Sequence, residues 1–137
     1  MQLTFHVQGG DFTRAGDAAS QVKKTLKLLN IDPGITKRVV VALYEAEVNI
    51  VAHACRGVIT ADIDPEQIRL RLEDEGPGIA DIEQAMQRGF STASPKVREM
   101  GFGAGMGLPN ILENADRLDI DSVVGKGTTL TITVALQ

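Results

Sequence analysis

The chain has 137 residues, of which 43% are hydrophobic and 23% charged, and its formal net charge is -4 at pH 7. This length predicts one domain spanning residues 1–137, and this composition excludes a disordered chain. The acidic balance gives no electrostatic reason to expect nucleic acid or a membrane surface as partner. A single cysteine excludes an internal disulfide, and no stretch approaches the roughly 20 apolar residues of a membrane span. We therefore expect a cytoplasmic protein.

Hydrophobic periodicity, turn residues and helix caps divide the chain into strands and helices. We expect, in chain order, a strand over 3–7, helices over 14–29 and 33–55, strands over 58–64 and 67–74, a short helix over 82–88, a helix over 106–117 and strands over 118–123 and 128–134. Asp11 or Thr13 is the expected cap of the first helix, and Asp32 that of the second. The polar segment 89–105 is long for a loop in a compact domain, which indicates either a functional lid or a disordered segment.

In this order, groups of helices alternate with pairs of strands that are joined as hairpins. Such an order favours an α+β fold, a two-layer α/β sandwich, over a doubly wound parallel sheet.

Polar residues line one face of the second expected helix. Glu45, Asn49 and His53 lie one turn apart on that face. An asparagine oxygen is a suitable ligand for Mg²⁺, and a neighbouring glutamate is then free to act as a general base. The same spacing also describes an ordinary polar pair on a solvated helix. His53 either orients Glu45 or caps the C-terminal end of the helix. Cys55 is expected to be a small buried residue.

An aspartate precedes a glycine turn at the end of the expected strand 67–74. Segment 74–79 reads Asp-Glu-Gly-Pro-Gly-Ile. A carboxylate at this place can accept a hydrogen bond from the exocyclic amine of adenine. A turn-forming aspartate is the alternative.

Segment 101–108 reads Gly-Phe-Gly-Ala-Gly-Met-Gly-Leu and comes just before an apolar helical pattern. Glycine lets a ligand approach the main chain, and a helix start offers N–H groups to an anion. A flexible linker has a similar composition. Arg88, Lys96 and Arg98 border this loop and either meet the outer phosphates or are solvated. Thr128 offers a hydroxyl near the base or belongs to a plain β-turn.

Taken in chain order, segments 45–53, 74–78, 101–107 and 127–128 resemble the nucleotide-binding boxes of the GHKL ATPases. That superfamily includes DNA gyrase, MutL, the histidine kinases and the anti-sigma-factor serine kinases. The resemblance covers residues 13–134. It implies the Bergerat fold, a mixed β-sheet with helices packed on one face, and it implies ATP and Mg²⁺ as cofactors.

The resemblance also implies residue roles. Glu45 would be the general base, Asn49 the Mg²⁺ ligand and Asp74 the reader of adenine. The implied nucleotide-binding residues are Asn49, Asp74, Gly76, Gly78, Ile79, Lys96, Gly101, Gly103, Ala104, Gly105, Met106, Gly107, Leu108 and Thr128.

Within the superfamily, the chain is most similar to the stand-alone serine kinases of stress and sporulation switches. Histidine kinases need a dimerisation helix before this domain, and gyrase and MutL need a transducer domain after it. Segment 82–92 resembles the stress-signalling branch. We therefore expect an ATP-dependent serine/threonine kinase of the anti-sigma-factor type. Its protein partner would be a regulatory protein as substrate. The resemblance leaves open whether the chain also binds a sigma factor, as some relatives do, and whether it pairs with a second copy, because relatives include both dimers and monomers.

Two other functions fit the same residues. One is an ATP-binding regulatory module that binds a sigma factor or another regulator without phosphoryl transfer. The other is a plain ATPase, in which water stands where a protein hydroxyl would lie.

Overall fold

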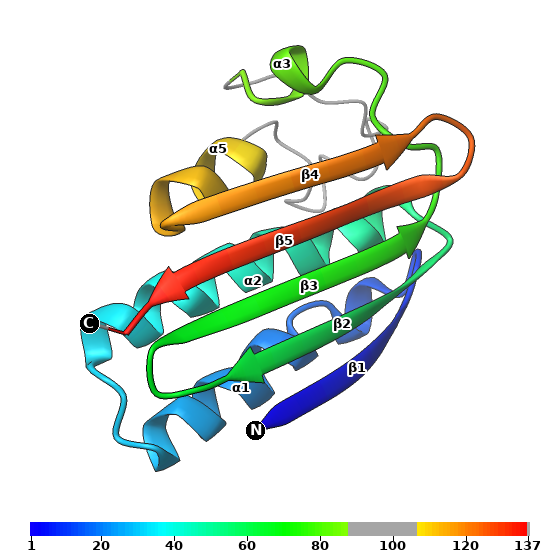
Figure 1. The fold of residues 1–137 in the computed structure, drawn as a ribbon. Helices are drawn as coiled ribbons and strands as arrows, with labels where there is room; N and C mark the ends of the chain where they lie inside the picture. The colour runs from blue at the N-terminus through cyan, green and yellow to red at the C-terminus, as the bar shows by residue number, and fades with distance from the viewer. Residues whose placement is uncertain (88–106, 137) are drawn as a thin grey trace.

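The computed structural model describes residues 1–87 and 107–136, and it arranges them as one sheet with helices on one face (Figure 1). The elements are β1 (Gln2–Gln8), the 3-10 helix η1 (Phe12–Arg14), α1 (Asp17–Leu28), α2 (Pro33–His53), β2 (Arg56–Ile63), β3 (Gln67–Glu75), α3 (Ile82–Ala85), α5 (Gly107–Asn114), β4 (Arg117–Val123) and β5 (Gly127–Ala135). Helices α1 and α2 lie behind the sheet in Figure 1, and no helix of the described residues covers its front face. The expected α+β, two-layer architecture is confirmed.

The sheet order is β1-β2-β3-β5-β4, and all four pairings among the described strands are antiparallel. The mixed sheet that the resemblance implied is therefore not what this part of the chain forms. The reason lies in the closing hairpin. Strand β4 runs in the direction of β3, but its partner β5 lies between them and is antiparallel to both.

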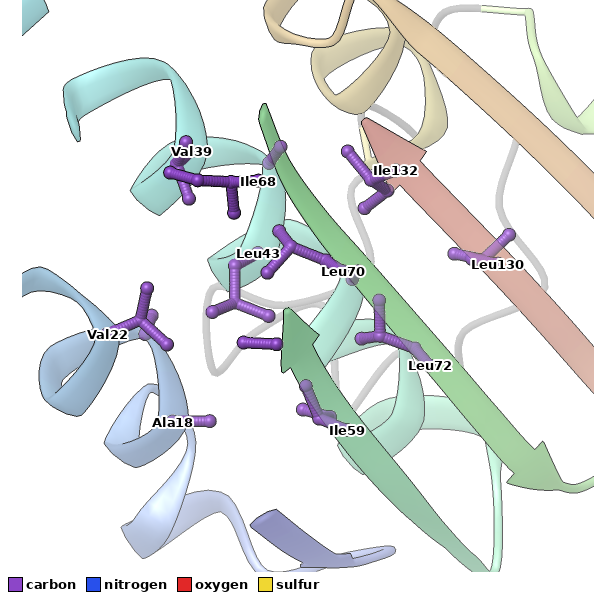
Figure 2. Packing of buried hydrophobic residues seen from close by; sticks show 14 of the residues in the cluster. Ala18, Val22, Val39, Leu43, Ile59, Ile68, Leu70, Leu72, Leu130 and Ile132 are labelled. Carbon is purple, nitrogen blue, oxygen red and sulfur yellow. The ribbon is translucent and has the colours of Figure 1, made fainter. Parts of the chain in front are cut away.

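The hydrophobic core fills the space between the sheet and the helices. Every second residue of β3 and β5 points into it, as the sequence alternation predicted. Figure 2 shows Leu43 of α2 between Val22 of α1 and Leu70 of β3, and all three side chains are fully buried. This core fixes α2 against the strands that carry the site.

Helix α1 begins at Asp17, later than predicted. The segment before it forms η1 and then turns at Gly16, whose φ of 98° favours glycine. The two side chains expected as caps bond to each other instead, since the Thr13 hydroxyl donates to Asp11 Oδ1 at 2.8 Å.

The N-terminus of α1 is capped from α2 by Glu47. The backbone N–H groups of Ala18 and Ala19 donate to the two carboxylate oxygens of Glu47, each at 3.1 Å. Glu47 is only 2% exposed, and a buried carboxylate requires such donors. The positive end of the α1 dipole favours it further. Glu47 thus ties the two helices together.

Helix α2 starts where predicted and ends earlier. The Asp32 carboxylate accepts from two backbone N–H groups of the first turn, at 3.0 and 3.2 Å. The helix ends at His53 because Ala54 is extended, with φ -99° and ψ 164°. Cys55 therefore lies in the connection to β2 and is exposed, so the expectation that it is buried was wrong.

The later helices are also shorter than predicted. Helix α3 ends at Ala85, and α5 ends at Asn114. The chain leaves α5 for the sheet, where Asp116 N donates to Thr133 O at 2.9 Å and β4 begins at Arg117. The lid predicted over 89–105 lies outside the described residues. Within those residues, no helix combines the length and apolar character needed to cross a bilayer.

Candidate functional site

The polar face of α2 is covered by the first turn of α5. Glu45 and Asn49 are both half-buried there. The side-chain amide of Asn110, on α5, donates to Glu45 Oε1 at 3.4 Å. Asn110 was not among the residues selected from the sequence. This hydrogen bond places it in contact with Glu45, the expected general base.

Gly107, the first residue of α5, lies directly against Asn49. A Cβ built on Gly107 would be 3.0 Å from both terminal atoms of the Asn49 side chain. Such a contact is tighter than real Cβ atoms usually make, so a larger residue would push the amide away. A glycine at this position therefore lets the start of a helix reach the Asn49 amide.

His53 continues the same face at the end of α2. Burial lowers the pKa of its imidazole below the ordinary value near 6.5. The ring is therefore neutral at pH 7. It does not supply the positive charge that a histidine can give to the end of a helix.

Asp74 lies at the end of β3, next to the start of β5. Its Oδ1 accepts a hydrogen bond from the backbone N–H of Thr128 at 3.0 Å. Burial raises the pKa of this carboxyl, and the hydrogen bond from Thr128 opposes that rise. The site thus holds a partly buried acid whose charged form gains from a further hydrogen-bond donor.

Ser122 joins the Thr128 side chain to the loop after β3. The hydroxyls of Ser122 and Thr128 lie 2.8 Å apart, and the Ser122 oxygen accepts from Ile79 N at 2.7 Å. Gly76 N donates to Lys126 O at 3.0 Å on the same side. Asp74, Thr128 and this loop are therefore one hydrogen-bonded unit across three strands.

Gly78 shapes the loop where it passes β4. Its φ is 75°, and a Cβ built there would lie 2.5 Å from the carbonyl oxygen of Val123. Both observations require glycine. The loop is thereby held close to the end of β4.

The two halves of the site meet at the C-terminal end of α2. Cys55 N donates to Glu75 O at 2.7 Å, and a Cβ on Gly76 would lie 3.0 Å from Ala54 Cα. The loop that follows Asp74 therefore packs on the same end of α2 that carries the polar face.

The structure places most of the predicted residues that it describes in two groups. Glu45, Asn49 and Gly107 form the α2–α5 side, and Asp74 and Thr128 the β3–β5 side. Leu108 is buried, and Ile79 packs against the core. The predicted residues that lie outside the described part are Arg88, Lys96, Arg98, Gly101, Gly103, Ala104, Gly105 and Met106.

Asn110, Ser122 and Glu47 are the contributing residues that sequence reasoning missed. Asn110 shares its helix with two other polar residues, Glu113 and Asn114, so the sequence does not single it out. Ser122 takes an inward position of β4 after the apolar Leu118 and Ile120, and this break in the alternation is a signal that could have been noticed. Glu47 lies only two residues after Glu45, and its burial is not visible in the sequence.

The oxygen atoms of Asn49 and Glu45 suit a hard cation that the phosphates of a bound nucleotide also coordinate. Across residues 1–87 and 107–136, no group of three or more His, Cys, Asp or Glu side chains could bind a metal ion. Mg²⁺ needs no such group, because one or two protein oxygens and substrate phosphates usually suffice. The amide oxygen of Asn49 beside the Glu45 carboxylate fits that use.

Comparison with known proteins shows the family to which the chain belongs. Residues 11–134 match the model of the histidine kinase-like ATPase domain. The serine/threonine-protein kinase RsbT of Bacillus subtilis is 32% identical over 124 residues, which cover 88% of this chain and 85% of RsbT. An anti-sigma F factor of a Thermoanaerobacter species is 38% identical over 97 residues, or 67% of this chain and 64% of that protein.

Solved structures show the same fold at low identity. The RsbU and RsbW domains of a Mycobacterium tuberculosis protein match 98% of this chain and 32% of theirs, with a TM-score of 0.63 and 18% identity. The mycobacterial sensor histidine kinase MprB matches 98% of this chain and 97% of its own, with a TM-score of 0.56 and 16% identity.

Proposed function

The chain belongs to the family of histidine kinase-like ATPase domains, and we propose that it is an ATP- and Mg²⁺-dependent protein kinase. Its substrate is a serine or threonine of a partner regulatory protein in a bacterial signalling switch. The observation that carries this proposal is the half-buried Glu45 beside Asn49 at the start of α5. We propose that residues 1–137 act as one domain in the cytoplasm.

The β3–β5 side binds the base. Asp74 uses Oδ1 for Thr128, which leaves Oδ2 to accept from the adenine amine. That bond favours the charged carboxylate against the burial that raises its pKa. Gly76, Gly78 and Ile79 form the wall of the base pocket, and the Thr128 hydroxyl contacts the adenine side.

The α2–α5 side binds the phosphates and the cation. The N-terminus of α5 at Gly107 offers backbone N–H groups and the positive end of its dipole. The remaining glycine-loop residues named above, together with Lys96, complete the phosphate contacts. Mg²⁺ neutralises charge on the terminal phosphates when bound, and the Asn49 oxygen is the protein ligand that this chain offers.

Glu45 acts as the general base. It takes the proton of the partner's hydroxyl, whose oxygen then attacks the γ-phosphorus in line while ADP leaves. Asn110 holds one carboxylate oxygen, which leaves the other for the proton. Transfer adds roughly -1.5 to -2 charges to the partner, enough to change a complementary interface.

The names of the relatives support the choice of partner. RsbT is named a serine/threonine-protein kinase, and the other relatives are named anti-sigma F factors. We propose that the substrate is an antagonist-like protein, which the chain phosphorylates, and that a sigma factor is a second protein ligand.

A transfer assay tests the function. Proteins that co-purify with the chain are isolated, then incubated with it, Mg²⁺ and γ-labelled ATP, and labelled serine or threonine is identified by mass spectrometry. Glu45→Gln should lower the transfer rate by about 10²- to 10⁴-fold, because the general base is lost. Glu66→Gln, at an exposed glutamate in the turn before β3, is the matched control and should transfer normally.

Two outcomes would refute the kinase. Partner binding that a non-hydrolysable ATP analogue supports fully, with no label on the partner, would indicate a regulatory module. Steady phosphate release without labelled protein would indicate an ATPase.

A further inference from the structure

Arg38 lies on the face of α2 that carries the site. It comes seven residues before Glu45, which is two helical turns, so the two side chains share a face. The half-buried Arg38 contacts the last residue of α5, Asn114, whereas Glu45 contacts Asn110, one turn earlier in that helix. The two helices therefore run antiparallel, and successive turns of α2 meet successive turns of α5.

The guanidinium of Arg38 makes two hydrogen bonds where α5 ends. Its Nε donates to the carbonyl oxygen of Asn114 at 3.2 Å, and its Nη2 donates to Asp116 Oδ1 at 3.1 Å. The last carbonyl groups of a helix lack partners within the helix, and the helix dipole favours a cation there. Arginine can make both bonds at once because its donors form a rigid planar fork. This double contact fixes the place where α5 ends along α2.

Asp116 fastens the same end of α5 to the sheet. Its backbone N–H donates to Thr133 O at 2.9 Å, and its Oδ2 accepts from Ala135 N at 2.7 Å. The hydrogen bond from Ala135 N, and after it that from Arg38, hold the pKa of the Asp116 carboxyl below its ordinary value, so the carboxyl is charged at pH 7. The end of α5 is thereby tied both to α2 and to β5.

Asn114 connects this anchored end to the site. Its side-chain amide donates to the carbonyl oxygen of Asn110, one turn earlier, at 2.8 Å. The side-chain amide of Asn110 donates in turn to Glu45 Oε1 at 3.4 Å. A continuous series of hydrogen bonds therefore leads from the Arg38 guanidinium to the Glu45 carboxylate.

The site tolerates little displacement of α5 along its axis. The bond from Asn110 to Glu45 is already long, and a helix advances about 1.5 Å per residue, so a slip by one residue would break it. The same slip would move the start of α5 relative to Asn49, which Gly107 contacts closely. The geometry of the site therefore depends on what holds α5 in place.

We propose that Arg38 is a positioning residue, which fixes the C-terminal end of α5 and so holds Asn110 against Glu45. It acts through Asn114 and Asn110. The consequence for phosphoryl transfer rests on the proposed function, in which Glu45 is the general base. The geometric consequence, the contact between Asn110 and Glu45, is independent of that function.

Nuclear magnetic resonance of the side-chain amides tests the geometry. The Asn110 amide signal is assigned by its loss in Asn110→Ala, and Glu45→Ala gives its position when the acceptor is absent. Arg38→Ala should move the Asn110 signal toward that position. Lys37→Ala, at the exposed neighbour on α2, is the matched control, because it removes the same charge and should leave the signal unchanged.

Asp116→Asn is a second variant for the case in which Arg38→Ala does not fold. It keeps an acceptor for Ala135 N but removes the negative charge that pairs with Arg38. The Asn110 signal should move in the same direction as in Arg38→Ala, by a smaller amount. Circular dichroism checks that each variant is folded.

Transfer rates at saturating ATP and Mg²⁺ test the consequence for the reaction. Arg38→Ala and Asn110→Ala should each slow transfer to the labelled partner about three- to tenfold, as expected for the loss of one hydrogen bond. The double variant should be no slower than the slower single variant, because both changes remove the same contact. Lys37→Ala should transfer at the wild-type rate.

An Asn110 signal that stays in place in folded Arg38→Ala and Asp116→Asn would overturn the proposal, as would a signal that moves equally in Lys37→Ala. Losses of rate that multiply in the double variant would also overturn it, because Arg38 would then act independently of Asn110. A wild type that labels no partner would refute the proposed kinase instead, and the amide signals would still decide whether Arg38 holds Asn110.

Discussion

Replacing Glu47 tests how the two long helices are held together. Its carboxylate accepts from Ala18 N and Ala19 N, each at 3.1 Å, in a place where both alanines are almost fully buried. Each orphaned N–H costs about 1–3 kcal/mol, and the relief of burying a charge offsets part of that sum. We expect Glu47→Ala to lower the free energy of unfolding by about 3–4 kcal/mol.

The free energy of unfolding of Glu47→Gln should lie between those of the wild type and Glu47→Ala. Glutamine keeps one acceptor but turns an amide N–H₂ toward the second donor, so we expect a loss of about 2 kcal/mol. Both losses are large against the 5–15 kcal/mol that a typical domain has in total.

Urea unfolding followed by circular dichroism measures these changes, provided that the slope with urea stays constant. Glu45→Gln is the matched control, because this half-buried residue caps no helix, and it should change stability by less than about 1 kcal/mol. If Glu47→Ala unfolds within about 0.5 kcal/mol of wild type, the reasoning about this cap is refuted.

Three further predictions concern the site. Burial raises the pKa of Asp74 in the folded protein, so the protonated carboxyl stabilises the fold below its ordinary pKa, and this stability is lost as pH rises through the raised value. Between pH 4 and pH 7, urea unfolding should therefore show a smaller fall in the free energy of unfolding for Asp74→Asn than for the wild type. Ser122→Ala removes the partner of the Thr128 hydroxyl, and calorimetry should show ATP affinity lowered about three- to tenfold, near 1 kcal/mol; unchanged affinity would contradict the proposed link. Gly107→Ala crowds the Asn49 amide, so the Mg²⁺-dependent part of ATP binding should weaken more than binding without Mg²⁺.

The sequence predicted the strands well because their inward positions alternate so clearly. Leu70, Leu72, Leu130 and Ile132 follow the period of two and are all in the core. Helix ends were predicted less well, since they depend on contacts between distant segments. The first helix was drawn too long because Asp11 and Thr13 are both good caps in isolation, yet they bond to each other.

Asp74 and Thr128 were both selected from the sequence as candidate site residues, and the structure joins them by the hydrogen bond from Thr128 N to Asp74 Oδ1. Asp74 and Thr128 lie far apart in the sequence, but a carboxylate before a glycine turn and a hydroxyl after another glycine marked them both. Asn110 could not be found in this way, because its importance comes from the partner that folding gives it. Ser122 could have been noticed as the polar residue at an inward position of β4. Spacing alone also could not tell Glu45, at the polar face, from Glu47, in the core.

Calorimetric titration with ATP, with and without Mg²⁺, tests the nucleotide site most directly. The wild type should bind ATP with micromolar affinity that Mg²⁺ strengthens, and Asp74→Asn should lose that binding while it stays folded. Equal binding by wild type and Asp74→Asn, or no binding by folded wild type, would contradict the account.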